Sequence, residues 1–397
     1  MHAKSEENIR KKIIGFLQHT APTKDWILKR EYIPHMAATV DAIYKEKSQW
    51  MNKNDVGFLI YVFVNKIVNE NNPANLDEYK NLSEITNINT KADELLSIIK
   101  SIPRDEYIYF PLPKFSIDIP IHIPLENGCE LIAIESDNVE QKKPSALILQ
   151  IPGGVKYYFK SKIHGYLGHS AKGVGYNLAL SQLKHFLERG YSLGFFETKI
   201  SWGFPQIERS VSRVYGWYTY TELGESERLQ KELPLDISHL LGRIGLSTSK
   251  GFDNTKSMVD NCSLVTDLIS SLNQLCSATG KIGNRIRSAS EWLFNSYAAE
   301  DDCMKLLQVC IGLESIYGED SSGEGLTESL SDRCAYSIGT SHASRAKIKQ
   351  DFRTIYKLRS KIVHGVIQRL SEEEAKFLQT GEILLRKSLH KEMLLQE

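Results

Sequence analysis

The sequence predicts an α+β protein with a helical N-terminal region (residues 1–105), a β-rich middle region of α+β type (106–246), a linker (247–256) and an all-helical C-terminal domain (257–397). Three observations predict this order. Apolar residues recur at helical spacing near both ends of the chain, β-rich runs bounded by Pro, Gly and Asn fill the middle, and a polar tract precedes the last part. The 397 residues, 41% hydrophobic and 25% charged, are ordinary for folded domains, which excludes disordered, collagen-like and coiled-coil proteins.

The charges of the chain balance. It has 49 Lys and Arg against 49 Asp and Glu, so it does not coat nucleic acid or membrane over its whole surface, and any such binding must be local. The longest apolar run, Val56–Val64, is less than half of the roughly 20 residues that cross a bilayer. The first residues are acidic, where a secretory signal has a basic start. We therefore expect a cytoplasmic protein that does not bind a membrane.

Two apolar stripes at helical spacing predict helices in the N-terminal region: Ile9, Ile13, Phe16 and Leu17, and, after the possible helix cap Asp55, Phe58, Leu59, Val62 and Phe63. The middle region has four β-rich runs, at residues 116–123, 130–135, 146–151 and 193–199, and one helix over 177–189 with Gly190 as its C-cap. Its glycine-rich segment, 165–175, has neither the Walker spacing nor a GxGxxG after a strand. We interpret that segment as a surface loop, and His164 and His169 as surface residues rather than metal ligands.

The C-terminal domain is expected to contain one helix with the stripe Val265, Leu268, Ile269, Leu272 and Leu275, followed by helices over 288–299, 302–317, 326–338, 344 to about 365, and 372–392. The six cysteines form no CxxC pair. Three of them, Cys303, Cys310 and Cys334, fall at apolar helical positions, where free thiols behave as small hydrophobic side chains. No zinc site, disulfide or cofactor is expected.

The helix that begins at Ser344 places an arginine on its apolar face. At about 100° per residue, Arg359 points in the direction of six apolar residues, Ile348, Phe352, Ile355, Ile362, Val363 and Val366. An unpaired buried charge is costly, so this position implies a carboxylate partner or a partly open polar pocket, unless the guanidinium reaches water at the helix edge. Glu314 lies on the apolar stripe of helix 302–317. We therefore expect a buried Glu314–Arg359 pair.

The opposite face of the same helix is basic. Between residues 343 and 369, eight Lys or Arg stand against one acid, Asp351, a local excess of seven positive charges. The side chains expected to bind phosphates are Lys349, Arg353, Lys357, Ser360 and Lys361. His364 lies among them, and histidine is the side chain that titrates near neutrality without perturbation. Charge runs are most often solvated faces, but basic groups around a histidine suit phosphate chemistry.

The segment Arg359-Ser360-Lys361-Ile362-Val363-His364-Gly365 resembles the RxxxxH signature of HEPN ribonucleases, and most closely the Apea-like HEPN family. Residues 312–318 and 330–336 resemble the second and third helices of that family, in the same order, and the likeness covers about residues 284–392. A second RxxxxH, from Arg30 to His35, has no basic surroundings and contains Pro34, which breaks helices. The N-terminal two thirds resemble no family.

The resemblance implies a metal-independent endoribonuclease. In such enzymes the ribose 2′-OH attacks its own 3′ phosphate and leaves a cyclic phosphate and a 5′-OH. His364 would be the general acid or base, Arg359 would stabilise the phosphorane oxygens, and Glu314 would complete this catalytic set. The resemblance further implies RNA as the substrate and a homodimer with facing motif helices. It also implies a role in phage defence or toxin-like growth arrest, with residues 1–246 as a sensor of an unidentified trigger or inhibitor.

Two questions stay open at the level of sequence. On an ideal helix Arg359 and His364 point about 140° apart and do not share one phosphate, so either the helix loosens at Gly365 or the two roles are divided across the dimer. Two other functions also remain, a noncatalytic HEPN module that binds RNA or a nucleotide, and a protein-interaction scaffold. RNA cleavage without metal separates the ribonuclease from the binding module, and RNA binding separates the module from the scaffold.

Overall fold

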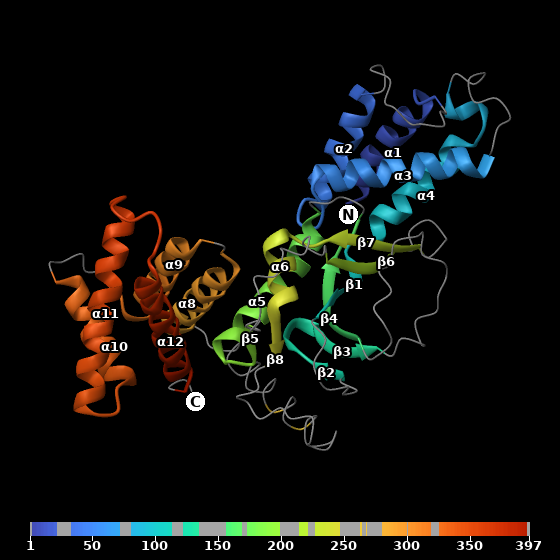
Figure 1. Ribbon diagram of the computed structural model, residues 1–397. Coiled ribbons are helices and arrows are strands. Elements are labelled where there is room, and N and C mark those ends of the chain that lie inside the picture. The colour runs from blue at the N-terminus through green and yellow to red at the C-terminus, as the bar shows by residue number, and fades with distance from the viewer. Residues whose placement is uncertain are drawn as a thin grey trace. The chain divides into compact units, whose positions relative to one another are not determined.

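The computed structural model describes residues 2–21, 33–71, 81–112, 122–134, 156–168, 173–198, 214–220, 227–246, 280–299, 301–318 and 325–394, with the single positions 263 and 267. The predicted α+β class is confirmed, because helices lie toward both ends of the chain and an antiparallel six-stranded sheet forms from its middle (Figure 1). The chain divides into two compact units, one of Met1–Phe110, Lys160–Gln182 and Tyr215–Lys231, the other of Pro111–Phe159, Leu183–Val214 and Glu232–Glu397. The predicted domain boundaries remain a prediction, and the predicted linker, 247–256, lies outside the described residues.

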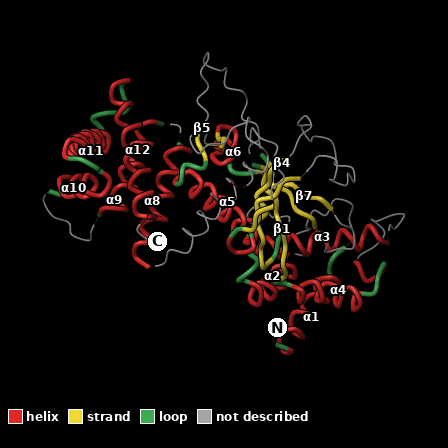
Figure 2. The backbone as a smooth tube through the Cα atoms, turned by 90° about the horizontal axis from the view of Figure 1, so that it is seen from below, coloured by secondary structure: helices red, strands yellow, loops and turns green. Residues whose placement is uncertain are grey.

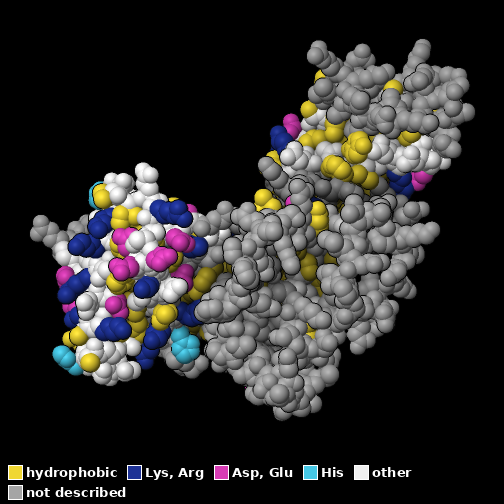
Figure 3. Space-filling model, in the orientation of Figure 1, with side chains coloured by type: hydrophobic (Ala, Val, Ile, Leu, Met, Phe, Trp, Pro, Cys, Tyr) yellow, Lys and Arg dark blue, Asp and Glu magenta, His cyan; other side chains and the backbone are white. Residues whose placement is uncertain are grey.

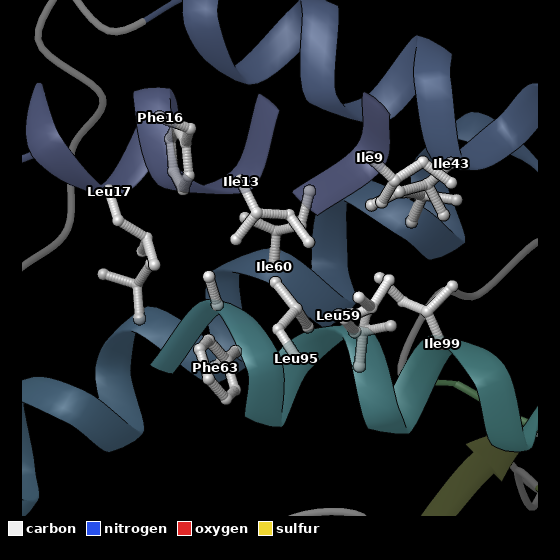
Figure 4. Packing of buried hydrophobic residues seen from close by; sticks show 14 of the residues in the cluster. Ile9, Ile13, Phe16, Leu17, Ile43, Leu59, Ile60, Phe63, Leu95 and Ile99 are labelled. Atoms are coloured by element: carbon white, nitrogen blue, oxygen red, sulfur yellow. The ribbon is translucent and has the colours of Figure 1, made fainter. Parts of the chain in front are cut away.

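The N-terminal helices are α1 (Ala3–Gln18), α2 (Ile33–Lys47), α3 (Lys53–Asn71) and α4 (Ile88–Ser101), with a 3₁₀ turn at Leu82–Glu84. The predicted stripe of α1 is confirmed, since all four of its residues are buried. They pack with Ile43 of α2, Leu59, Ile60 and Phe63 of α3, and Leu95 and Ile99 of α4 (Figure 4). Burial of apolar surface from four helices therefore stabilises this bundle.

The predicted start of α3 was wrong by one turn. Asn52 precedes the helix, and its side chain accepts the Asp55 N–H at 2.9 Å while the Asp55 carboxylate accepts the Asn52 N–H at 3.0 Å. This reciprocal arrangement is a capping box, which places Asp55 inside the first turn. The stripe was also shifted, because Phe58 is 36% exposed and Val62 is only half-buried, whereas Val56 is fully buried.

The main sheet has the strand order β2-β3-β4-β1-β6-β7. Figure 2 shows strands of this sheet in yellow, with β1, β4 and β7 labelled. Its strands are β1 (Arg104–Pro111), β2 (His122–Pro124), β3 (Glu130–Ile134), β4 (Lys156–Gly165), β6 (Tyr215–Tyr220) and β7 (Glu227–Glu232). In the antiparallel pair β1–β6, Ile108 lies opposite Tyr218 and Tyr109 opposite Trp217. A separate two-stranded sheet pairs β5 (Phe196–Thr198) with β8 (Ile244–Leu246), and α6 (Leu235–Arg243) precedes β8.

The predictions for the middle region met mixed outcomes. The run 130–135 forms β3 and the end of 193–199 forms β5, whereas 146–151 and most of 116–123 lie outside the described residues. The predicted helix is longer than expected, because α5 spans Val174–Ser192. Gly190 is inside it and not its C-cap. A Cβ on Gly190 would lie 2.4 Å from the Phe196 ring, so the glycine permits close packing there, and the left-handed residue after the helix is Gly194, with φ 67°.

The glycine-rich segment is not a surface loop in its described parts. Tyr166, Leu167 and Gly168 are buried, and a Cβ on Gly175 would lie 2.3 Å from the Tyr166 carbonyl oxygen. These glycines therefore permit a close backbone approach at the start of α5. His164 lies at the end of β4 and is exposed, as expected, whereas His169 lies outside the described residues.

The C-terminal bundle consists of α8 (Gly280–Ala298), α9 (Asp302–Tyr317), α10 (Leu326–Ile338), α11 (His342–Val363) and α12 (Glu372–Leu394). All five agree with the predicted ranges to within a few residues, apart from the earlier start of α8. Of the predicted helix over 265–275 the structure describes only Asp267, which is helical. The bundle core contains the fully buried side chains Leu293, Leu306, Leu313, Phe352, Ile355 and Leu385. Throughout the residues described, no helix combines the length and the apolar character that crossing a membrane requires.

Candidate active site

The helix that carries the RxxxxH segment has well-formed ends. Ser341 caps the start of α11, because its hydroxyl accepts the Ser344 N–H at 3.1 Å. At the other end Gly365 adopts φ 72°. Its N–H donates to the Ile362 carbonyl at 3.0 Å, and the Val366 N–H donates to the Lys361 carbonyl at 2.8 Å. This is a Schellman motif, with His364 at the C-cap and Gly365 in the left-handed position that glycine favours.

His364 still follows the path of the helix. Its N–H donates to the Ser360 carbonyl at 3.0 Å, and its backbone angles are φ −83° and ψ 6°. The chain therefore leaves the helix one residue after the histidine. Because the spiral continues through residue 364, the angle of about 140° between the directions of Arg359 and His364 persists. The His364 side chain is exposed.

The predicted apolar stripe of α11 was partly wrong. Phe352 and Ile355 are fully buried, but Val363 is 54% exposed and Val366 is 71% exposed. The helical projection does not apply to Val366, which lies beyond the helix, and Val363 is the last helical residue, where packing partners are fewer. Tyr356 and Leu358 are buried instead.

Glu314 and Arg359 meet across α9 and α11, as predicted. The Arg359 Nη2 lies 3.5 Å from the Glu314 Oε1. The predicted burial of the pair was wrong, since the side chains are 37% exposed for Arg359 and 29% exposed for Glu314. One side of the pair borders the core, where the buried Tyr356 hydroxyl donates to the Cys310 carbonyl at 3.3 Å. The other side faces solvent, so a solvent-borne anion can reach the guanidinium.

The surroundings of the Glu314–Arg359 pair raise the pKa of two neighbouring side chains. Burial raises the pKa of the Cys310 thiol, and the Glu314 carboxylate raises it further. Burial likewise raises the pKa of Tyr356. Both groups are therefore neutral at physiological pH, and they do not compete with a bound anion for the Arg359 guanidinium.

Two further arginines lie at the end of α9. Arg285 of α8 donates to the Gly318 carbonyl at 2.9 Å, and Arg333 of α10 donates to the Tyr317 carbonyl at 2.8 Å. Cations at a helix C-terminus satisfy the last carbonyls and complement the helix dipole. These contacts fix the end of α9, the helix whose last turns carry Glu314.

The basic face of α11 is neutralised in its first half by α10. Lys349 Nζ lies 2.6 Å from the Asp332 carboxylate, and Arg353 Nη2 lies 2.6 Å from the Glu328 carboxylate. The partners are spaced four residues apart on each helix, so they form an antiparallel ladder of ion pairs. The predicted binding of phosphates by Lys349 and Arg353 stays a prediction, and in this half each cation already has a carboxylate partner. Figure 3 shows the result, with basic and acidic side chains interspersed over the C-terminal helices.

One helical turn further along, α10 carries an aromatic ring where the ion-pair ladder would have its next acid. Tyr336 of α10 is 63% exposed, and the Arg345 guanidinium lies 5.0 Å from its ring centre. Lys349 Nζ also approaches this ring, at 5.2 Å. Cations at these distances are attracted by the face of the ring. The contact joins the start of α11 to the end of α10.

The second half of the basic face differs from the first. Lys357 and Ser360 are exposed and Lys361 is half-buried. Among the residues that the structure describes, no carboxylate lies within ion-pair distance of either lysine. These three of the five predicted phosphate-binding residues are the ones nearest in the chain to Arg359 and His364. They therefore remain available to a ligand close to those two residues.

The expectation that Pro34 breaks a helix at the second RxxxxH copy was wrong. Helix α2 begins at Ile33, so Pro34 lies in its first turn, where proline is tolerated, and Arg30 lies outside the described residues. His35 is exposed, and its ring stacks on His19 with centroids 4.1 Å apart.

The thiols of Cys303, Cys310 and Cys334 are free and buried, and Cys129 is also buried. Within the described ranges, no three His, Cys, Asp or Glu side chains are grouped as metal ligands.

The sequence did not reveal the partners that neutralise the basic face. Along the chain, Asp332 and Glu328 lie on α10 and their partners on α11. Their pairing therefore depends on how the two helices pack together. The four-residue spacing on both helices was the available signal. In comparisons with known proteins, no family model, no curated protein and no solved structure matches this chain.

Proposed function

We propose that the C-terminal helical bundle is a metal-independent endoribonuclease of the HEPN type. The observation that carries the proposal is the half-exposed Glu314–Arg359 pair, whose arginine lies on the same helix, α11, as the exposed C-cap residue His364. A purely structural ion pair has no need of access to solvent. A guanidinium that binds a phosphate must keep part of its fork open while a carboxylate holds its orientation.

The chemistry follows from the residue types. The ribose 2′-oxygen bonds to the adjacent phosphorus while the bond from phosphorus to the 5′-oxygen breaks. His364 acts as a general acid or base, either taking the proton of the 2′-OH or giving a proton to the leaving 5′-oxygen. Arg359 stabilises the negative charge that grows on the non-bridging oxygens. Glu314 is a positioning residue, because it contacts the guanidinium and not the substrate. The need for a 2′-OH selects RNA over DNA.

The proposed active site is divided between two subunits. Arg359 and His364 point about 140° apart on a helix that is regular through residue 364, so one phosphate is not shared by both side chains of one chain. In a homodimer with facing α11 helices, Arg359 of one copy and His364 of the other act on the same phosphate. The isologous symmetry of such a dimer creates two equal sites.

RNA is held mainly by the last two turns of α11. Lys357, Ser360 and Lys361 supply phosphate contacts there, and Lys349 and Arg353 contribute less because carboxylates of α10 already pair with them. We further propose that the protein acts in the cytoplasm in phage defence or toxin-like growth arrest, with residues 1–246 as its sensor or regulator.

The test is cleavage of total RNA by the full-length protein in EDTA. His364→Ala should lower the rate by about 100- to 10,000-fold, the loss expected for a positioned acid or base. The thermal midpoint and RNA affinity should change little because the side chain is exposed and the lysines remain. The matched control is His35→Ala, in the second RxxxxH copy, which should retain the parent rate. A His364→Ala protein that cuts RNA at the parent rate, free of contaminating nuclease, would leave a noncatalytic RNA-binding module as the better description. A protein that neither cuts nor binds RNA would be a scaffold.

A further inference from the structure

Three neighbouring strands of the main sheet separate their side chains into two faces. On β1, Ile108 and Phe110 are fully buried and belong to the inner face, where Phe110 contacts Tyr176 of α5. The alternate residues, Asp105, Tyr107 and Tyr109, belong to the outer face. The same alternation puts Lys160, Lys162 and His164 of β4, and Tyr215 and Trp217 of β6, on that outer face. We call these eight residues the outer sheet face.

The outer sheet face is rich in aromatic rings. Tyr109 stacks on Trp217, its directly opposite partner, with ring centroids 4.0 Å apart and planes at 8°. Such a cross-strand pair stabilises a sheet and by itself indicates no ligand. Tyr107 and Tyr215 lie outside the pair and are 37% and 41% exposed. Two large rings therefore present surface to solvent beside a stacked pair.

Cationic side chains lie between the rings. Lys160 Nζ lies 4.5 Å from the centre of the Tyr107 ring. Lys162 Nζ lies 2.7 Å from Asp105, and the same carboxylate lies 2.9 Å from His164 Nδ1. Asp105 is the only acid of the eight residues, and it is shared by two basic side chains. The outer sheet face is therefore aromatic and carries an excess of positive charge.

We propose that the outer sheet face binds a segment of single-stranded nucleic acid. Bases stack on exposed rings regardless of sequence, and lysines beside those rings follow the phosphates. The charges favour this ligand over a neutral polysaccharide, which is bound through carboxylates and amides, because the one carboxylate here is already occupied. They also favour it over an apolar protein surface, which would leave two lysines and a histidine desolvated.

This site is independent of the proposed ribonuclease. All eight residues belong to the first compact unit, whereas Arg359 and His364 belong to the second. A nucleic-acid site on the outer sheet face would identify single-stranded nucleic acid as the class of ligand that the first compact unit binds. Stacking is tolerant of sequence, so the site recognises single-strandedness rather than a particular base order.

The test uses oligo(dT) as the probe, because DNA lacks the 2′-OH and stays intact whether or not the protein cuts RNA. Fluorescence anisotropy of a short labelled oligo(dT) is measured with the full-length protein in a Lys357→Gln/Lys361→Gln background, which removes the proposed contacts on α11. Replacing Tyr107 and Tyr215 by alanine should weaken binding by about 5- to 100-fold for each ring that stacks on a base. The matched control is Tyr107→Phe/Tyr215→Phe, which keeps both rings and should bind as its parent does.

A second variant keeps the proposal testable if the alanine protein does not fold. Lys160→Gln should lower the slope of log affinity against log salt by about 0.7, the value for one phosphate of a single strand, whereas Lys162→Gln should change it less because Asp105 already pairs with that lysine. An oligonucleotide that contains 5-bromodeoxyuridine should, when irradiated, crosslink to peptides that contain Tyr107, Tyr215 or Trp217. Unchanged affinity and salt slope in folded variants, or crosslinks confined to the C-terminal helices, would overturn the proposal. So would retention by an immobilised polysaccharide without any affinity for oligo(dT).

Discussion

Arg359 and Glu314 form a half-exposed pair, and this exposure changes what their removal should do. Leaving one charge of a buried pair alone costs about 3 to 5 kcal/mol, whereas exposed pairs contribute about 0 to 1 kcal/mol. At 37% and 29% exposure the second range applies. We predict that Arg359→Ala lowers the free energy of unfolding by no more than about 1 kcal/mol but abolishes RNA cleavage, as urea unfolding and RNA digestion will show.

Glu314→Ala should act through Arg359. Cleavage should fall because the guanidinium loses its orientation, and Glu314→Gln should restore part of the rate because it keeps one oxygen acceptor at the same place. In a double-mutant cycle the two side chains should show a coupling free energy of about 0.5 kcal/mol. Additive effects on both stability and rate would mean that the contact is not used.

Glu188 of α5 is a buried carboxyl with a different role. Burial raises its pKa to about 7, and the nearby Glu291 carboxylate of α8 raises it further, partly opposed by Lys184 and Arg189. The folded protein therefore keeps this proton between about pH 4.5 and pH 7, where the unfolded chain has lost it. The native state binds more protons in that window, so the free energy of unfolding falls as the pH rises through it, by up to about 3 kcal/mol.

We predict that Glu188→Gln removes this dependence. Its stability relative to the parent should grow from about pH 4.5 to pH 7 and stay constant above, measured by urea unfolding at each pH. Glu373→Gln, at an exposed position of α12, is the control and should follow the parent curve. Parallel curves for the parent and Glu188→Gln would show that the carboxyl is not neutral in the folded protein.

At the scale of elements, α10 and α11 divide the basic face into a paired half and an available half. Lys357→Gln/Lys361→Gln should weaken RNA binding and lower its salt slope by about two phosphate contacts. Lys349→Gln/Arg353→Gln removes the same number of charges, but their carboxylate partners on α10 already neutralise them. This matched variant should leave the salt slope nearly unchanged and lower the thermal midpoint slightly. Filter binding at several salt concentrations distinguishes the two, and equal slopes for both variants would contradict the division.

The helices of the C-terminal bundle were predictable because their signals are local. Periodic apolar residues, the Asp301 and Ser341 caps and the left-handed Gly365 all lie within a few residues of the ends they define. Strands depend on partners far along the chain. The segments of β4 and β6 alternate outer residues with buried ones, yet neither was predicted as a strand. The outer residues of β6, Tyr215 and Trp217, are not the polar ones expected of a solvent-facing sheet.

The candidate site was predictable to the level of contacts but not of exposure. Helical projection placed Glu314 and Arg359 on facing stripes, and the structure joins them at 3.5 Å. Projection reports the direction of a side chain along one helix, and burial depends on how much of the neighbouring helix covers it. The same limit explains Val363, the last residue of α11, which points with the stripe but is 54% exposed.

On the scale of the whole molecule, the zero net charge hides a local arrangement. The excess of seven positive charges between residues 343 and 369 is matched in part by Glu328 and Asp332, which pair with Arg353 and Lys349. Among the cations outside these pairs, Lys357 and Lys361 lie close to Arg359 and His364 in sequence. Nonspecific electrostatic attraction is therefore weak, and affinity for RNA must come from the few contacts at the end of α11.

The directions of Arg359 and His364 lead to a prediction about assembly. If each active site takes Arg359 from one subunit and His364 from the other, two inactive proteins should complement each other. Equal amounts of Arg359→Ala and His364→Ala proteins are mixed and allowed to exchange subunits. Half of the dimers are then mixed, and each has one intact and one doubly defective site, so RNA cleavage should recover to about a quarter of the parent rate. Light scattering confirms the dimer, and differently tagged copies confirm the exchange. If exchange is complete and cleavage stays at the level of the separate variants, both side chains act within one subunit and the end of α11 must rearrange when RNA binds.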